Sequence, residues 1–270
     1  MRIRANNAIG GVLIGVLVAT AVTACFWTPF EPLRVNLRAR LQPPSALHWF
    51  GTDEFGRDVL SRIMAGALTS LMVALMTVVC AVVIGALIGV VTGYFRGWID
   101  RAIMAVNDAL LSFPGVLLAL AMMMIVGANK FGIVLALSLA YTPSVVRVVR
   151  GTVLSIREKE YIEASRVIGN SELYSMLRHV LPNSLAPVAV LATSMFGWVL
   201  LAESALSFLG LGVPPPAPTW GNMLAASRPY LETAAWLSIA PGLCIALTLL
   251  GINLLGDAMR DHLDPRTAWE

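Results

Sequence analysis

The chain has 270 residues, of which 57% are hydrophobic and 13% are charged, and its formal net charge is +3. Soluble domains carry about 25% charged residues, so this composition excludes a water-soluble globular protein. The small positive charge lies in short loops beside apolar segments, where anionic lipid headgroups account for it without nucleic acid.

Six apolar segments are predicted to be membrane-spanning helices, because a helix needs roughly 20 residues to cross about 30 Å of hydrocarbon. In chain order they are residues 8–27, 71–94, 102–126, 131–146, 185–211 and 234–255. The fourth is the shortest, since Lys130 and Arg147 bound it and Pro143 lies in its last turn. The predicted fold class is therefore an all-α integral membrane protein with about six transmembrane helices.

The distribution of Lys and Arg predicts that both termini are cytoplasmic. An even number of spans places the termini on one side, and cytoplasmic loops carry more cations. With that orientation the inner cations are Arg2, Arg4, Arg96, Arg101, six cations from Arg147 to Arg178, Arg260 and Arg266. Five arginines in the loop after the first span oppose this orientation, but Asp53, Glu54 and Asp58 offset them locally.

The predicted organisation is one membrane domain preceded by an extra helix. Its parts are an N-terminal tail with the first transmembrane helix (1–28), an extracytoplasmic loop (29–70), the transmembrane domain (71–256) with a cytoplasmic loop (147–184), and a cytoplasmic tail (257–270). Within the extracytoplasmic loop, Val59, Ile63 and Ala67 recur at helical spacing. This spacing predicts a short helix lying along the outer membrane surface.

Local patterns in the spans predict how the helices pack. Gly85, Gly89 and Gly93 recur every fourth residue, the small-residue spacing that lets helix backbones approach closely. Gly11 and Gly15 form a weaker instance of this pattern in the first span. Pro114 is expected to kink the third span, because proline removes a backbone donor and clashes with the preceding turn.

Two acidic residues fall inside predicted spans, where an ionised group costs about 3 kcal/mol. Glu203 in the fifth span is interpreted either as a pathway or gate residue or as a hydrogen-bonded carboxyl packed between helices. Asp108 in the third span either lines the inner mouth of a pathway or pairs with a nearby arginine such as Arg101, seven residues away. The sequence leaves both pairs of alternatives open.

The polar segment from Glu158 to Pro182 carries the strongest functional signal. It is predicted to form a helix, a turn at Gly169, a second helix and a proline stop. On the second helix, one stripe holds the apolar residues Leu173, Met176, Leu177, Val180 and Leu181. An apolar ridge that projects into water is unfavourable, so we expect another subunit to cover it.

The spacing of Glu163-Ala164-Ser165, Gly169 and Leu181-Pro182 resembles the cytoplasmic EAA loop of permease subunits in ABC importers. Ser165 stands where that pattern has its second alanine, and His179 stands where it has isoleucine. The resemblance extends over nearly the whole chain, through the motifs Phe50–Asp58, Ser207–Gly212 with Pro214–Pro216, and Asp261–Arg266. Together these motifs resemble the second permease of dipeptide, oligopeptide and nickel importers.

The resemblance implies a type I ABC importer permease fold in a bacterial inner membrane. It implies a heterodimer with a paralogous permease, one or two ABC ATPase subunits and an extracytoplasmic solute-binding protein. The implied ATPase-coupling residues are Glu163, Ala164, Ser165, Gly169, Leu173, Met176, Leu177, Leu181 and Pro182. No Gly-rich loop precedes a Lys-Ser or Lys-Thr pair, so we expect ATP and Mg²⁺ to bind partner subunits, with no cofactor and no enzyme activity in this chain.

The outer loop at 213–221 holds four prolines, which favour a stiff, extended backbone. It is interpreted either as a docking surface for the binding protein or as a rigid connection. Candidate contacts for a binding protein are Asp53, Arg57, Pro215 and Trp220.

The sequence leaves alternatives open for the substrate and for the class of transporter. A di- or oligopeptide importer is the preferred interpretation, and a nickel or metallophore importer is the first alternative. Adjacent methionines at 122–124 point to different helix faces and cannot form one metal site. An ion-coupled secondary transporter is a further alternative, which predicts paired ionisable residues inside the membrane and leaves the segment from Glu158 to Pro182 unexplained.

Overall fold

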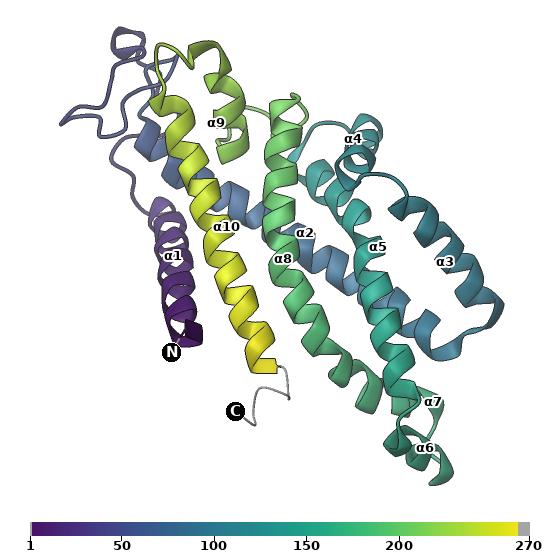
Figure 1. Cartoon of the computed structure of the whole chain (residues 1–270). Helices are drawn as coiled ribbons and strands as arrows, with labels where there is room; N and C mark the ends of the chain where they lie inside the picture. The colour runs from purple at the N-terminus through teal and green to yellow at the C-terminus, as the bar shows by residue number, and fades with distance from the viewer. Residues whose placement is uncertain (1, 264–270) are drawn as a thin grey trace.

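The structure is a computed structural model that describes residues 2–263. This part of the chain is helical and contains no β-strand (Figure 1). The long helices are α1 (Arg2–Ala24), α2 (Val59–Phe95), α3 (Gly97–Leu111), α4 (Gly115–Val126), α5 (Lys130–Arg157), α8 (Leu181–Phe208) and α10 (Trp236–Leu263). Five spans are long and apolar enough to cross a membrane, and α3 with α4 forms a sixth, bent candidate. The prediction of an all-α membrane protein is confirmed.

The shorter helical elements lie at the two ends of the bundle. They are the 3-10 turns η1 (Leu37–Ala39) and η3 (Arg228–Tyr230), the helices α6 (Glu160–Val167), α7 (Glu172–Ser175) and α9 (Trp220–Ser227), and the π-helical segment η2 (Met176–Val180). The first turn of α1 and the last turn of α10 lie at the same end of the bundle as α6 and α7, and α9 lies at the opposite end (Figure 1).

Helix α2 is one continuous helix of 37 residues, so the separate surface helix predicted around Val59–Ala67 is wrong. Its first turn is capped by Asp58, whose carboxylate accepts a hydrogen bond from the Ser61 amide at 2.8 Å. No proline or glycine pair breaks the chain before the predicted span, and Val59, Ile63 and Ala67 are buried. At 1.5 Å per residue the helix is about 55 Å long and runs obliquely behind α8 and α10 (Figure 1).

The predicted close packing at Gly85, Gly89 and Gly93 is confirmed by their contacts with α5. A Cβ atom added at these glycines would lie 2.6, 2.7 and 2.9 Å from side-chain carbons of Val145, Val149 and Val153. The glycines therefore let three valines of α5 fit against the α2 backbone. In α1 the close approach is at Gly10, where an added Cβ would lie 3.0 Å from the Gly251 carbonyl oxygen. At Gly11 and Gly15 an added Cβ would meet no atom within 4 Å.

The third predicted span is broken, with α3 and α4 bent by 97° at Ser112–Pro114. The kink expected at Pro114 is thus confirmed as a sharp corner. Helix α5, predicted to end near Val146, continues through Pro143 to Arg157. The additional turns carry Arg147 and Arg150, each of which pairs with a carboxylate of α3.

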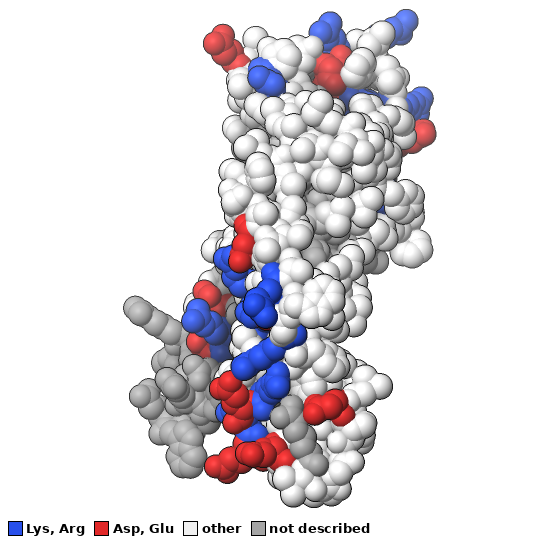
Figure 2. Space-filling model, turned by 90° about the vertical axis from the view of Figure 1, so that its right-hand side faces the viewer, with Lys and Arg blue, Asp and Glu red and all other residues white. Residues whose placement is uncertain are grey.

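The predicted proline stop at Pro182 is also wrong, because η2 passes directly into α8 and Pro182 lies in its first turn. Proline is tolerated there, since the first turn of a helix needs no intrahelical N–H donor. Charged side chains gather toward the two ends of the face seen in Figure 2 and leave an almost uncharged band between them. The last part of the Asp261–Arg266 motif, with Arg266, lies outside the described residues.

Candidate functional site

The segment from the end of α5 into the first turn of α8, residues 158–182, is called the coupling segment. Gly169 has φ +92° and forms the turn between α6 and α7, a conformation that side-chain-bearing residues rarely adopt. Ser171 caps α7 by accepting a hydrogen bond from the Tyr174 amide at 3.2 Å. The predicted order of helix, glycine turn and helix is therefore observed.

Ser165 connects the two short helices of the coupling segment. Its side chain is buried, its hydroxyl lies 3.0 Å from the Ser175 hydroxyl, and the Asn170 amide donates to it at 3.1 Å. An alanine at this position makes none of these hydrogen bonds. The departure from the EAA pattern is thus compensated by two polar partners that the sequence alone did not identify.

The apolar stripe of the second short helix does not form one exposed ridge, which corrects the prediction. Met176 and Val180 are buried in the bundle, whereas Leu173 and Leu177 are 58% and 52% exposed. The most exposed apolar side chains of the coupling segment are Val167 at 83% and Ile168 at 80%, directly before Gly169. We call Val167 and Ile168 the apolar tip; the sequence signal for it was two β-branched residues preceding a turn glycine.

Polar contacts attach the coupling segment and the last residue of α5 to the end of α2. The Tyr94 hydroxyl donates to the Glu172 carboxylate, and Arg157 donates to the Tyr94 carbonyl. The Arg157 guanidinium also lies 5.7 Å from the centre of the Tyr94 ring. The coupling segment is therefore in contact with α2 as well as being continuous in the chain with α5 and α8.

Glu163 and Ala164, both predicted coupling residues, are exposed on α6. Leu181 is partly buried and Pro182 is exposed at the start of α8. Glu163 lines a hollow of about 340 Å³ together with Arg96, Arg157, Glu158 and Lys159. The structure thus places Glu163 beside the corner between α2 and α3.

Asp108 pairs with Arg147 of α5, at 2.6 Å, and not with Arg101. Both side chains of this pair are 58% exposed, so the carboxylate remains open to solvent. The sequence missed a second pair about two turns earlier on α3, in which Arg150 donates two hydrogen bonds to Asp100 at 2.7 and 2.8 Å. Asp100 is buried, so the two arginines fasten α3 to α5 in different environments.

An apolar groove of about 420 Å³ opens between α2, α3 and α5 beside these ion pairs. Its wall includes Ile84, Ile88, Val106 and Leu139, and the residues with polar side chains in its lining are Asn107 and Thr142. The Asn107 amide donates to the Pro143 carbonyl at 3.3 Å, which connects α3 to the proline turn of α5.

Glu203 is 1% exposed and lies between α8 and the start of α9. Its Oε1 accepts hydrogen bonds from the Ser207 and Thr219 hydroxyls at 2.9 and 3.1 Å. Its Oε2 is buried without a hydrogen-bond partner among the described residues and faces Gly221, where an added Cβ would lie 2.9 Å away. In this conformation Glu203 is a packed carboxyl and does not line an open pathway.

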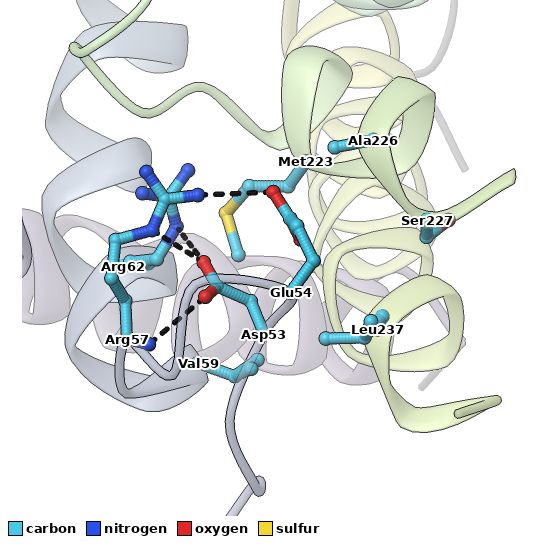
Figure 3. Close-up of a pocket in the computed structure, with 9 residues that line it drawn as sticks. All are labelled: Asp53, Glu54, Arg57, Val59, Arg62, Met223, Ala226, Ser227 and Leu237. Carbon is cyan, nitrogen blue, oxygen red and sulfur yellow. Dashed lines mark hydrogen bonds and ion pairs between the residues drawn. The ribbon is translucent and has the colours of Figure 1, made fainter. Parts of the chain in front are cut away.

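The predicted binding-protein contacts divide into buried and exposed residues. Two arginines converge on Asp53 (Figure 3), with Nε of Arg57 at 2.6 Å and Nε of Arg62 at 3.4 Å from its Oδ2. Beside them is a cavity of about 10 Å³, room for a single water. Burial also raises the pKa of the neighbouring Glu54 carboxyl.

Asp53 and Trp220 are buried and so do not offer contacts to a binding protein in this structure, which corrects the prediction for both. The Trp220 indole donates to the Ile63 carbonyl at 3.1 Å, and its ring packs beside Gly66 of α2. Its large apolar ring is therefore held by α2 rather than by the membrane surface. Pro215 remains exposed, and Arg57 is largely covered by its ion pairs.

Comparison with known proteins gives relatives over almost the full chain. A putative peptide transport system permease protein of Brucella suis biovar 1 is 42% identical over 263 residues, 97% of this chain and 88% of the relative. A dipeptide transport system permease protein of Alkalihalophilus pseudofirmus is 42% identical over 96% of this chain and 85% of its own length. A glutathione transport system permease protein of Escherichia coli O6:K15:H31 is 41% identical over 83% of this chain and 74% of its own length.

A family described as the binding-protein-dependent transport system inner membrane component matches residues 82–269. The match includes the α2–α5 packing, the coupling segment and the buried Glu203. The chain belongs to this family of ABC transport permeases.

Proposed function

We propose that this chain is one permease subunit of an ATP-driven importer for di- or oligopeptides, working as a heterodimer with a paralogous permease. The names of its relatives, which include peptide, dipeptide and glutathione permeases, support the substrate class. The observation that supports association with ATPase subunits is the coupling segment, with its exposed apolar tip and its contact with α2. One or two ATPase subunits bind this tip, and a solute-binding protein delivers substrate at the opposite end.

The end of the bundle that bears the coupling segment faces the cytoplasm, together with the start of α1 and the end of α10. Location in the inner membrane is supported by the family match and by the apolar helices. The positive-inside distribution of Lys and Arg supports this orientation.

In the proposed cycle, ATP closes the partner ATPases and displaces the coupling segment. Tyr94 and Arg157 carry that displacement into α2, while the unbroken join of η2 and α8 carries it into the fifth span. ATP shifts the population toward the outward-open state because it binds that state more tightly. The pathway runs between the two permeases, along the apolar groove beside Asp108.

Association with the ATPases is tested by charging the apolar tip. A Val167→Asp/Ile168→Asp double variant should lower recovery of the ATPase subunits with the tagged permease by at least about tenfold, because charged groups replace apolar contacts at an interface centre. The matched control is Leu33→Asp/Leu37→Asp, at two apolar residues 42% and 67% exposed in the outer loop. Equal ATPase recovery from both variants would contradict the assignment of the tip.

Substrate class is tested with the assembled transporter in vesicles, supplied with its solute-binding protein. ATP-dependent accumulation of a labelled di- or oligopeptide supports the proposal. Accumulation of a nickel chelate without peptide uptake replaces it with the metallophore alternative. Uptake driven by an ion gradient without ATPase subunits replaces it with the secondary-transporter alternative.

A further inference from the structure

We propose that the hollow at the α2–α3 corner binds the phosphate group of an anionic phospholipid. Three cations, Arg96, Arg157 and Lys159, and two carboxylates, Glu158 and Glu163, line its volume of about 340 Å³. The lining therefore carries one more positive than negative charge. The volume far exceeds the roughly 30 Å³ that a water molecule occupies in the liquid, so there is room for a headgroup phosphate.

Arg96 is available for an incoming anion. Its ion pair with Glu158, at 3.0 Å, joins side chains that are 48% and 70% exposed. Exposed pairs of this kind contribute little and exchange readily for a stronger anion. Lys159 is exposed and has no ion-pair partner within residues 2–263.

Arg96 at this corner has a backbone conformation that residues with side chains rarely adopt. Its φ of 56° and ψ of −161° fall in a region that suits glycine, and Gly97 directly follows it with φ 87°. Strained residues of this kind persist where surrounding structure holds them, and they are frequent at ligand sites.

The surroundings of the hollow favour a lipid over a soluble anion. Phe95, Trp98 and Ile99 project from the same corner and are 57%, 75% and 47% exposed. Aromatic residues at this level of a membrane protein lie among the headgroups, and basic pockets at the cytoplasmic side take anionic lipids. A phospholipid whose phosphate occupies the hollow would thus lay its acyl chains against these exposed apolar and aromatic side chains.

The test uses the assembled transporter, purified in detergent and supplied with phosphatidylglycerol, phosphatidylcholine or inorganic phosphate, with retained lipid counted by native mass spectrometry. Wild type should retain phosphatidylglycerol in preference to phosphatidylcholine. An Arg96→Gln/Lys159→Gln double variant should bind it about tenfold more weakly or worse, since each cation near the surface contributes to anionic lipid binding. Lys159→Gln alone, which leaves the strained corner intact, should show a smaller loss in the same direction.

The control is Arg34→Gln/Arg38→Gln, which removes two exposed cations at the opposite end and should retain phosphatidylglycerol like wild type. Equal retention by the two double variants would overturn the proposal. Displacement of phosphatidylglycerol by millimolar inorganic phosphate would assign the hollow to a soluble anion and would contradict its assignment as a lipid site. Loss of the lipid from wild type whenever the ATPases are bound would assign the hollow to the ATPase interface. The inference takes the cytoplasmic placement of the hollow from the proposed function, but lipid retention is counted without a transport assay, so failure to bind lipid and failure to transport peptide are distinguishable outcomes.

Discussion

Glu203 shows how a single ionisable residue inside the membrane can serve packing. Its Oε1 receives the hydroxyls of Ser207 on α8 and of Thr219, the residue that caps α9. The carboxyl group thereby joins a spanning helix to the short helix at the outer end. An acceptor oxygen, and not a negative charge, is what this geometry requires.

We therefore predict that Glu203→Gln preserves folding and uptake, because its amide oxygen can accept both hydroxyls. Glu203→Leu should lower the free energy of unfolding by about 1–3 kcal/mol, since it leaves buried hydroxyls without an acceptor. Thermal unfolding of the detergent-solubilised protein measures both variants. A Gln variant that folds normally but has lost uptake would show that ionisation of Glu203 is needed for transport.

At the scale of elements, α2 and α5 pack closely, with three glycines of α2 facing three valines of α5. Gly89→Ala should destabilise the protein by about 1–3 kcal/mol, because the new methyl would lie 2.7 Å from the Val149 Cβ. Gly151→Ala on α5, which meets no atom within 4 Å, is the control. It should be neutral or stabilising by up to about 1 kcal/mol in a helix. Equal unfolding temperatures for the two variants would contradict this packing.

The two ion pairs between α3 and α5 should differ in their contribution to stability. Arg150→Gln leaves the buried Asp100 without its bidentate partner and should cost about 2 kcal/mol or more. Arg147→Gln removes an exposed pair and should cost less than about 1 kcal/mol. Both arginines lie on α5 and lose the same charge, so the difference in unfolding temperature isolates the effect of burial. A larger loss for Arg147→Gln would contradict the described environments.

At the scale of the whole molecule, the proposed function requires the coupling segment to hold its shape. Gly169→Asp should leave the protein inserted, with ATP hydrolysis uncoupled from uptake, because a side chain is strained at φ +92°. Gly127→Asp, at φ +86° and also free of neighbours, imposes similar strain away from the coupling segment. Hydrolysis and uptake measured at matched expression give the coupling ratio. Normal uptake by Gly169→Asp would contradict the role of this turn.

Features encoded by short-range spacing were predictable from the sequence. The four-residue interval of Gly85, Gly89 and Gly93 and the break at Pro114 depend on neighbours within one or two turns, and both are found in the structure. The helix, turn and helix order around Gly169 is equally local. Local spacing identified these features, whereas the partners of the glycines, three valines of α5, are seen only in the tertiary structure.

Features that depend on distant partners were not predictable. Asp108 meets Arg147, 39 residues away, and Trp220 is buried by Ile63 and Gly66 of α2. The continuity of α2 was missed because Val59, Ile63 and Ala67 recur at helical spacing in either case. The same apolar stripe is expected whether a membrane surface or the helices α9 and α10 cover it. Helical spacing shows which face is apolar, but not what packs against it.

The length of α2 has a mechanical consequence. Helices α5, α8 and α10 each contain an internal proline, whereas α2 contains none and spans about 55 Å as a stiff rod. One end contacts Trp220 of α9, and the other end carries Tyr94, which contacts the coupling segment. A rotation of about 10° around its middle would move its two ends in opposite directions by roughly 5 Å each, from the 1.5 Å rise per residue. Docking outside and nucleotide binding inside would then act on opposite arms of one lever.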